Sequence, residues 1–131
     1  MMLDHLGITV SDYARAKAFY AAVLEPLGYR LLMEPIDGAA GFGFDGPFGP
    51  KPALWLYGAE QTMRPVSGAA HVALEARDRA SVDAFHAAAL AAGATDNGAP
   101  GVREIYHPTY YAAFVLDFDG NNLEAVCHRP A

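Results

Sequence analysis

The spacing of apolar and polar residues at the start of the chain predicts a β-strand followed by a helix. Residues 3–10 alternate, which places apolar side chains on one face of a strand and His5 on the other. Ser11 or Asp12 can cap a helix whose apolar residues recur at helical spacing, namely Ala16, Phe19, Tyr20, Val23 and Leu27. Short segments at 29–34, 41–44 and 53–57 then predict three strands, and the Gly/Pro-rich residues 45–52 predict a loop.

The second half of the chain predicts the same order of elements. After a polar connector at 60–68, residues 70–76 alternate as a strand, and Asp78 can cap a helix over 79–92 that Gly93 ends. Strands are expected at 102–106, 111–117 and 122–128, with a tight turn at Asp119-Gly120-Asn121 between the last two. Both halves therefore follow a β-α-β-β-β plan.

The two halves are copies of one sequence unit. Residues 5–24 and 71–90 align without gaps, are identical at eight of twenty positions, and place His5 on His71. A duplicated unit forms a domain with pseudo-twofold symmetry. We expect one α+β domain over 1–131, with βαβββ units at about 1–60 and 69–131 paired into an open barrel-like sheet around a central cavity. His5 and His71 are expected on neighbouring central strands, pointing into that cavity, where two imidazoles suggest a metal.

Composition narrows the classes of partner. The 131 residues are 53% hydrophobic, which is enough for a single core. A net charge of −6 and only nine Lys and Arg argue against nucleic acid or an anionic membrane and favour a small-molecule ligand. Cys127 is the only cysteine, and the N-terminus has neither a basic start nor a long hydrophobic stretch, so we expect a cytoplasmic protein without disulfides.

Three local motifs give the chain a family resemblance. These are DHLGITVSD at 4–12, AAHVALEA at 69–76, and a D-x-D-G-N-x-x-E pattern that ends at Glu124. With the paired units, they resemble the vicinal oxygen chelate superfamily, which includes glyoxalase I, extradiol dioxygenases, fosfomycin-resistance thiol transferases, methylmalonyl-CoA epimerase and bleomycin-binding proteins. The resemblance covers nearly the whole chain.

The resemblance implies a metal site. In metal-using members the ligands lie on the first strand of each unit and on the last strand of the second, which correspond to His5, His71 and Glu124. Two imidazoles and one carboxylate leave open positions on a divalent ion such as Fe, Zn, Mn or Ni. His128 lies four residues, or about 13 Å, along the strand from Glu124, which is too far to bind the same ion. Glu75 is equally far from His71 and is excluded for the same reason.

The chain departs from four-ligand relatives at one position. Members such as glyoxalase I carry a further ligand on the last strand of the first unit, where this chain has Trp55 or Tyr57 opposite Glu124. This departure favours the three-ligand style of extradiol dioxygenases and thiol transferases over isomerase or epimerase chemistry. The aromatic side chain is expected to line the cavity wall.

Residues 106–111 are a second candidate for chemistry, because they bring one histidine and three tyrosines together in a loop. His107 can act as a general base near a bound substrate, and Tyr110 can donate to a developing oxyanion. The alternative is that the tyrosines only pack the mouth of the barrel.

Two classes of function remain open. The first is a metal-dependent enzyme, a lyase, dioxygenase or transferase of the glyoxalase type, in which the ion chelates neighbouring oxygens of a small substrate. The second is a metal-free module that sequesters a flat ligand between aromatic walls, as bleomycin-binding members do. In either case the resemblance and the open sheet edges favour a homodimer.

Overall fold

The chain folds into two similar halves, each a four-stranded sheet with one long helix. The computed structural model describes residues 3–131. Strand order is β1-β4-β3-β2 in the first sheet and β5-β8-β7-β6 in the second, so the two halves share one topology. The first half comprises β1 (Leu6–Val10), α1 (Tyr13–Leu24), η1 (Glu25–Leu27), β2 (Arg30–Ile36), β3 (Ala39–Gly46), β4 (Gly49–Gly58) and α2 (Ala59–Thr62). The second half comprises β5 (His71–Glu75), α3 (Arg79–Ala91), β6 (Thr95–Val102), β7 (Tyr111–Leu116) and β8 (Asn122–Cys127).

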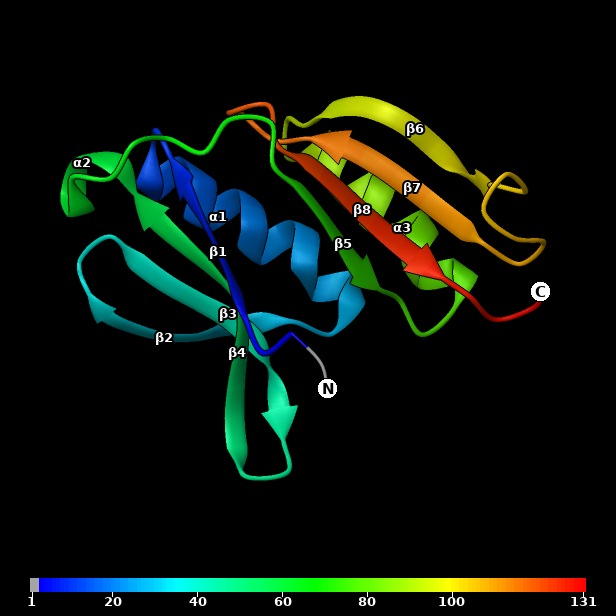
Figure 1. Ribbon diagram of the computed structural model, residues 1–131, viewed down its shortest axis with the longest axis horizontal. Coiled ribbons are helices and arrows are strands. Elements are labelled where there is room, and N and C mark those ends of the chain that lie inside the picture. The colour runs from blue at the N-terminus through cyan, green and yellow to red at the C-terminus, as the bar shows by residue number, and fades with distance from the viewer. Residues whose placement is uncertain (1–2) are drawn as a thin grey trace.

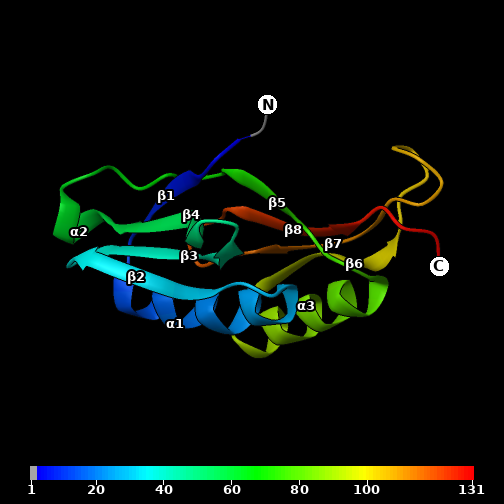
Figure 2. The ribbon, with the colours of Figure 1, turned by 90° about the horizontal axis from the view of Figure 1, so that it is seen from below.

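The sheets lie side by side, and both long helices cover the same face of the pair (Figures 1 and 2). The predicted α+β class and the paired βαβββ units are confirmed, with sheets that do not close into a barrel. The core lies between sheets and helices and includes Phe19, Tyr20, Phe42 and Phe85, which are at most 3% exposed. Neither long helix covers the opposite face of the sheets, so a site can form on that face.

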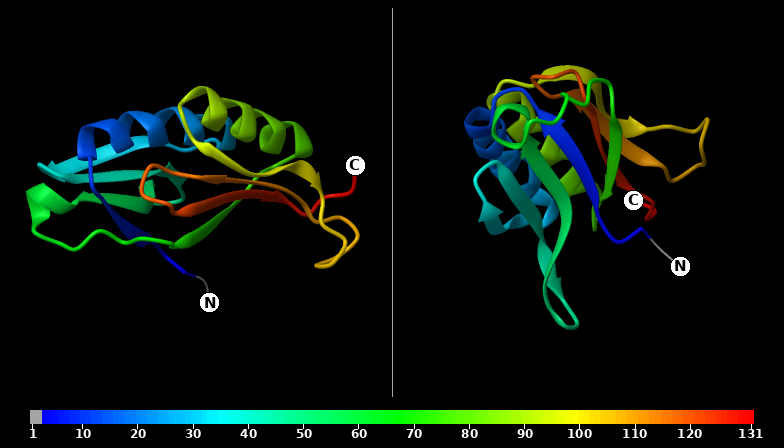
Figure 3. Two further views of the ribbon diagram at one scale, coloured as in Figure 1. Left: turned by 90° about the horizontal axis from the view of Figure 1, so that it is seen from above. Right: turned by 60° about the vertical axis from the view of Figure 1, so that its left-hand side comes forward.

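Each helix begins where the sequence predicts, because an aspartate caps it. The side chain of Asp12 accepts a hydrogen bond from the Arg15 amide, and that of Asp78 accepts one from the Ser81 amide. The two caps are equivalent positions of the duplicated unit, so the same local chemistry starts both helices. Side by side, α1 and α3 form one layer (Figure 3, left).

Two sequence predictions about strands were wrong. The predicted loop at 45–52 is instead the end of a long β3–β4 hairpin that projects from the body (Figure 3, right). The strand predicted at 102–106 lies earlier, as β6 over Thr95–Val102. Both segments are rich in Gly, Pro, Asn or Asp, residues that normally disfavour strands. β6 tolerates them as an edge strand whose pairing with β7 shifts register twice.

The strands next to His5 and His71 are also arranged differently from the sequence prediction. β1 and β5 are edge strands of separate sheets, each paired in parallel with the last strand of its own half. They are therefore not hydrogen-bonded neighbours at the centre of one sheet. His5 precedes β1, which begins at Leu6, whereas His71 is the first residue of β5.

The turn between β7 and β8 ties the second half to helix α1. The Asp117 carboxylate accepts hydrogen bonds from the Asp119 and Asn121 amides, from Asn121 Nδ2 at 2.8 Å and from the Tyr20 hydroxyl at 2.6 Å. Burial, with the Asp117 charge beside it, raises the pKa of Tyr20 well above its ordinary value, so the phenol remains a donor. The D-x-D-G-N part of the motif is thus structural, and it fixes where β8 begins.

Within residues 3–131, the helices are all too short or too polar to cross a membrane.

We predict that Asp117→Ala lowers the free energy of unfolding by about 2–4 kcal/mol, because it leaves several buried donors without an acceptor. The matched control is Asp119→Ala in the same turn. The Asp119 side chain accepts an exposed hydrogen bond from the Ser11 amide, so its loss should cost less than about 1 kcal/mol. Urea unfolding of both variants measures the difference, and equal losses would contradict this role for Asp117.

Candidate functional site

A cavity of about 330 Å³ lies between the two sheets and is lined by both duplicated histidines. Its walls come from the segment before β1, from β4 and from β5, and the lining residues include His5, Tyr29, Ala53, Leu54, His71 and Ala73. The side chains of His5 and His71 are 57% and 54% exposed, so both imidazoles are accessible from this cavity and from solvent.

Glu124 lies on β8 beside His71 and is almost fully buried. Its neighbours Leu123 and Ala125 belong to the core, so alternation along the strand turns Glu124 to the opposite face. Its Oε1 lies 2.8 Å from His71 Nε2, and its Oε2 accepts a hydrogen bond from the Tyr110 hydroxyl. The carboxylate is only 2% exposed, and its two oxygens each have a partner, as a buried charge requires.

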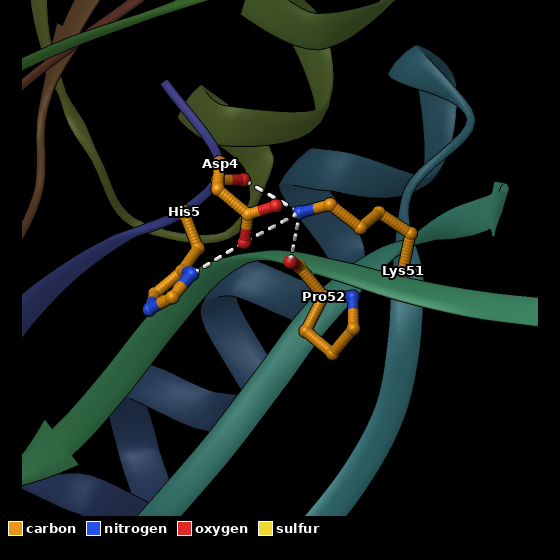
Figure 4. A network of polar contacts seen from close by, with 4 residues as sticks. All are labelled: Asp4, His5, Lys51 and Pro52. Atoms are coloured by element: carbon orange, nitrogen blue, oxygen red, sulfur yellow. Dashed lines mark hydrogen bonds and ion pairs between the residues drawn. The ribbon is translucent and has the colours of Figure 1, made fainter. Parts of the chain in front are cut away.

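His5 is held by a separate polar network (Figure 4). Its Nδ1 lies 2.6 Å from the Asp4 carboxylate, and Lys51 of β4 binds the same carboxylate at 3.1 Å and the Asp4 carbonyl oxygen at 2.6 Å. The hydrogen bond with His5, supported by Lys51, lowers the pKa of Asp4 below its ordinary value. Since a carboxylate accepts, His5 presents Nδ1–H to Asp4 and keeps the lone pair of Nε2 free.

The three predicted metal ligands are brought together only in part. His71 and Glu124 are in direct contact, and His5 lines the same cavity as His71. Among residues 3–131, however, no three His, Cys, Asp or Glu side chains are close enough to hold one ion. Two of the predicted ligands therefore form a preassembled pair, and the third lies apart.

Of the two predicted acid–base residues, Tyr110 contacts Glu124 and His107 packs against Tyr110. Burial and the hydrogen bond to Glu124 raise the pKa of Tyr110 to about 12, so the hydroxyl keeps its proton at neutral pH and donates a hydrogen bond to Glu124. His107 lies against Tyr110, with ring centroids 5.3 Å apart, and its Nε2 is 2.9 Å from Nδ1 of His128. The partnership of His107 with His128 was not predicted, because strand spacing shows only that His128 is far from Glu124.

The Trp55 and Tyr57 side chains lie on the face of the first sheet away from the helices, and the cavity that one of them was expected to line is formed by other residues. The Trp55 and Tyr57 rings are stacked, with centroids 6.4 Å apart and planes 13° from parallel. They lie over glycines of the neighbouring strands, because a Cβ at Gly41 would come within 2.9 Å of Trp55 and one at Gly7 within 2.6 Å of Tyr57. The guanidinium carbon of Arg64 lies 4.0 Å from the centroid of the Tyr57 ring.

The duplication shows which aromatic residue replaces a ligand. Gly7 pairs with Trp55 in the first half, and Ala73, its equivalent in the second half, pairs with Glu124. Trp55 therefore takes the place that Glu124 has in the second half. The sequence alone left Trp55 and Tyr57 as alternatives.

The remaining histidine has a structural contact. His86 is 8% exposed, and its Nε2 lies 3.0 Å from the carboxylate of Asp96, whose pKa this hydrogen bond lowers. It connects α3 to β6 and lies outside the candidate site.

Several solved structures have the same fold as this chain. A structure of a glyoxalase/bleomycin resistance protein from Albidiferax ferrireducens is 27% identical, has a TM-score of 0.78, and the match covers 99% of this chain and 100% of that chain. A lactoylglutathione lyase from Agrobacterium tumefaciens is 18% identical with a TM-score of 0.67, over 96% of this chain and 92% of that chain. TioX from a Micromonospora species is 18% identical with a TM-score of 0.68, over 98% and 100%.

No curated protein sequence matches the chain. The sequence profile of the Glyoxalase/Bleomycin resistance protein/Dioxygenase superfamily matches residues 2–125, which is almost the whole chain. The family that the motifs suggested is confirmed by this match and by the shared fold. The chain belongs to the Glyoxalase/Bleomycin resistance protein/Dioxygenase superfamily.

Proposed function

We propose that the protein is a small metal-dependent enzyme of the glyoxalase/dioxygenase type, with His5, His71 and Glu124 as the ligands of a divalent ion. The observation that carries the proposal is the contact between His71 and the buried Glu124 at a cavity that His5 also lines. Its substrate would be a small molecule with two neighbouring oxygen atoms.

The donor atoms of the second half suit such an ion. Imidazole nitrogen and carboxylate oxygen are both common ligands of divalent ions. His71 Nε2 and Glu124 Oε1 already lie 2.8 Å apart, so the two side chains would hold the same ion. Glu124 would supply the negative charge, and Tyr110 would hold its second oxygen.

His5 suits the role of third ligand in its chemistry, although it does not contact the other two. A metal-binding histidine normally donates its second ring N–H to a carboxylate or carbonyl group, which fixes the tautomer. Asp4 provides that acceptor for Nδ1 of His5 and leaves Nε2 available. We propose that His5 joins His71 and Glu124 when an ion binds, since its ring is more than half exposed and is held by a hydrogen bond to its neighbour Asp4.

The bound ion would act as a Lewis acid toward two substrate oxygens. Tyr110 would act on the ligand set and not on the substrate, because its hydroxyl donates its hydrogen to Oε2 of Glu124 and so keeps the carboxylate in place. Leu6, Leu54 and Leu74, which line the cavity with the two histidines, would form an apolar wall for the carbon skeleton of the substrate.

A second candidate function is metal-free binding of a flat ligand, as in bleomycin-resistance proteins. The observation that favours it is the Trp55–Tyr57 stack, which offers a preformed aromatic surface, together with the separation of His5 from the other two ligands. The two functions differ in whether the protein binds a divalent ion, so a titration of the protein with zinc and manganese distinguishes them.

We predict that the untagged protein binds one divalent ion and that Glu124→Gln weakens this binding more than tenfold, or about 1.4 kcal/mol. The amide keeps an acceptor for Tyr110 but loses the charge, so the metal-free variant should melt close to the metal-free parent. The matched control is Glu75→Ala, which removes an exposed carboxylate from β5 without touching Glu124. Calorimetric titration with zinc and manganese measures the affinities.

Equal losses in Glu124→Gln and Glu75→Ala would contradict the proposed ligand set. Failure of the parent protein to bind any divalent ion would instead favour the metal-free binding module.

We also propose that the protein is a homodimer, because edge strand β2 and the β3–β4 hairpin expose apolar side chains. Ile36 is 61% exposed and Phe48, at the tip of the hairpin, is fully exposed. Sedimentation equilibrium at micromolar concentration should give twice the chain mass of 13.9 kDa. A single species of 13.9 kDa would refute the dimer.

A further inference from the structure

Two histidines that belong to different segments meet at the end of the second sheet. His107 lies in the loop between β6 and β7, and His128 directly follows β8. Nε2 of His107 and Nδ1 of His128 are 2.9 Å apart, and the ring planes are 26° from parallel. One of the two nitrogens must carry a hydrogen and the other a lone pair, because the contact is a hydrogen bond.

The backbone of Thr109 determines which nitrogen is the donor. The Thr109 N–H can only donate, and it points to Nδ1 of His107 at 3.2 Å. Nδ1 of His107 therefore carries a lone pair, so the neutral ring carries its hydrogen on Nε2. It follows that His107 donates to His128 and that the hydrogen of neutral His128 is on Nε2.

A hydrogen bond to the backbone also connects the loop to the end of β8. The Thr109 hydroxyl donates to the His128 carbonyl oxygen at 2.7 Å, and the Tyr110 amide donates to the His107 carbonyl oxygen at 3.2 Å. The loop therefore has two connections to His128, one through the imidazole and one through the backbone. The imidazole connection depends on the side chain at position 128, whereas the backbone connection does not.

Tyr110 stands against both imidazoles. Its ring centroid lies 5.3 Å from that of His107 and 5.4 Å from that of His128, with interplanar angles of 77° and 81°. Edge-to-face contacts of this kind are favourable and restrict the orientation of the ring. The Tyr110 hydroxyl, at the far end of this ring, donates to Oε2 of the buried Glu124.

We propose that His107 and His128 form a clamp that positions the Tyr110 hydroxyl on Glu124. Both are positioning residues, because they act through Tyr110 and do not contact Glu124. Nδ1 and Nε2 of His107 are both occupied, so this role replaces the acid–base role expected from the sequence. The importance of the clamp for catalysis rests on the proposed function, whereas the clamp itself can be tested in metal-free protein.

A metal ion is a poorer explanation for the histidine pair. A neutral His107 that bound an ion through Nε2 would carry its hydrogen on Nδ1. That hydrogen would face the Thr109 N–H, and one hydrogen bond of the loop would be lost. The observed contacts suit a hydrogen shared between two rings better than an ion.

The decisive comparison is between His128→Ala and His128→Asn in metal-free protein. Asparagine places its side-chain oxygen near the position of Nδ1, so it keeps an acceptor for His107, whereas alanine removes it. Two signals report the result: the ring carbon-13 resonance of the Tyr110 phenol at neutral pH, assigned with Tyr110→Phe, and the amide exchange rates of Thr109 and Tyr110. His5→Asn is the control, since it changes a histidine outside the clamp.

We expect His128→Ala to move the Tyr110 resonance toward that of solvent-exposed tyrosine and to accelerate both amides by about tenfold or more. His128→Asn should restore most of both signals, and His5→Asn should change neither. Long-range nitrogen-15 spectra of the parent should show both histidines with hydrogen on Nε2.

An unchanged Tyr110 resonance in His128→Ala would overturn the clamp, as would hydrogen on Nδ1 of His107 in the parent. Loss of the signals in His128→Asn to the same extent as in His128→Ala would overturn it too, because the acceptor would then be irrelevant. None of these outcomes depends on metal binding, so failure of the clamp and failure of the proposed metal site are distinguishable.

Discussion

The buried carboxylate of Glu124 is the constraint around which the second half of the site is arranged. A charged group that is 2% exposed is stable only if its oxygens have partners, and removing one partner from a buried pair commonly costs about 3–5 kcal/mol. His71 and Tyr110 provide these partners from opposite sides. Each partner is itself placed by the fold, since His71 begins β5 and Tyr110 directly precedes β7.

The position of Glu124 also depends on the tight turn between β7 and β8. Asp117 and Asn121 close this turn, and Asn121 also accepts from the Ala70 amide, which directly precedes β5. The same motif therefore sets the start of β8 and holds β5 beside it. Because the pairing places His71 opposite Asn122 and Ala73 opposite Glu124, the imidazole can reach the carboxylate.

The sequence predicts the large-scale organisation because the duplication and the helix caps are local signals. The shared topology of the two halves and the aspartate caps of α1 and α3 follow directly from residues 66 positions apart. Strand β6 was misplaced because its residues disfavour strands and are held there by pairing with β7, which is a long-range effect.

Only those residues of the candidate site that lie in the family motifs could be predicted from the sequence. The family resemblance placed His71 and Glu124 in one site, and the parallel pairing of β5 with β8 brings the two side chains into contact. The contact of His107 with His128 depends on how a loop folds back on the end of a strand, and alternation along β8 contains no information about that loop. His5 was expected in a shared group, yet it is oriented by Asp4 and Lys51 before β1 begins.

The central claim is that His5, His71 and Glu124 hold one divalent ion. The most direct measurement is a crystal structure of the protein with zinc or manganese, with the ion located by its anomalous scattering. We expect one ion bonded to His71 Nε2, Glu124 Oε1 and His5 Nε2, at distances of about 2.0–2.2 Å. An ion bound elsewhere, or a cavity without an ion at saturating metal, would contradict it.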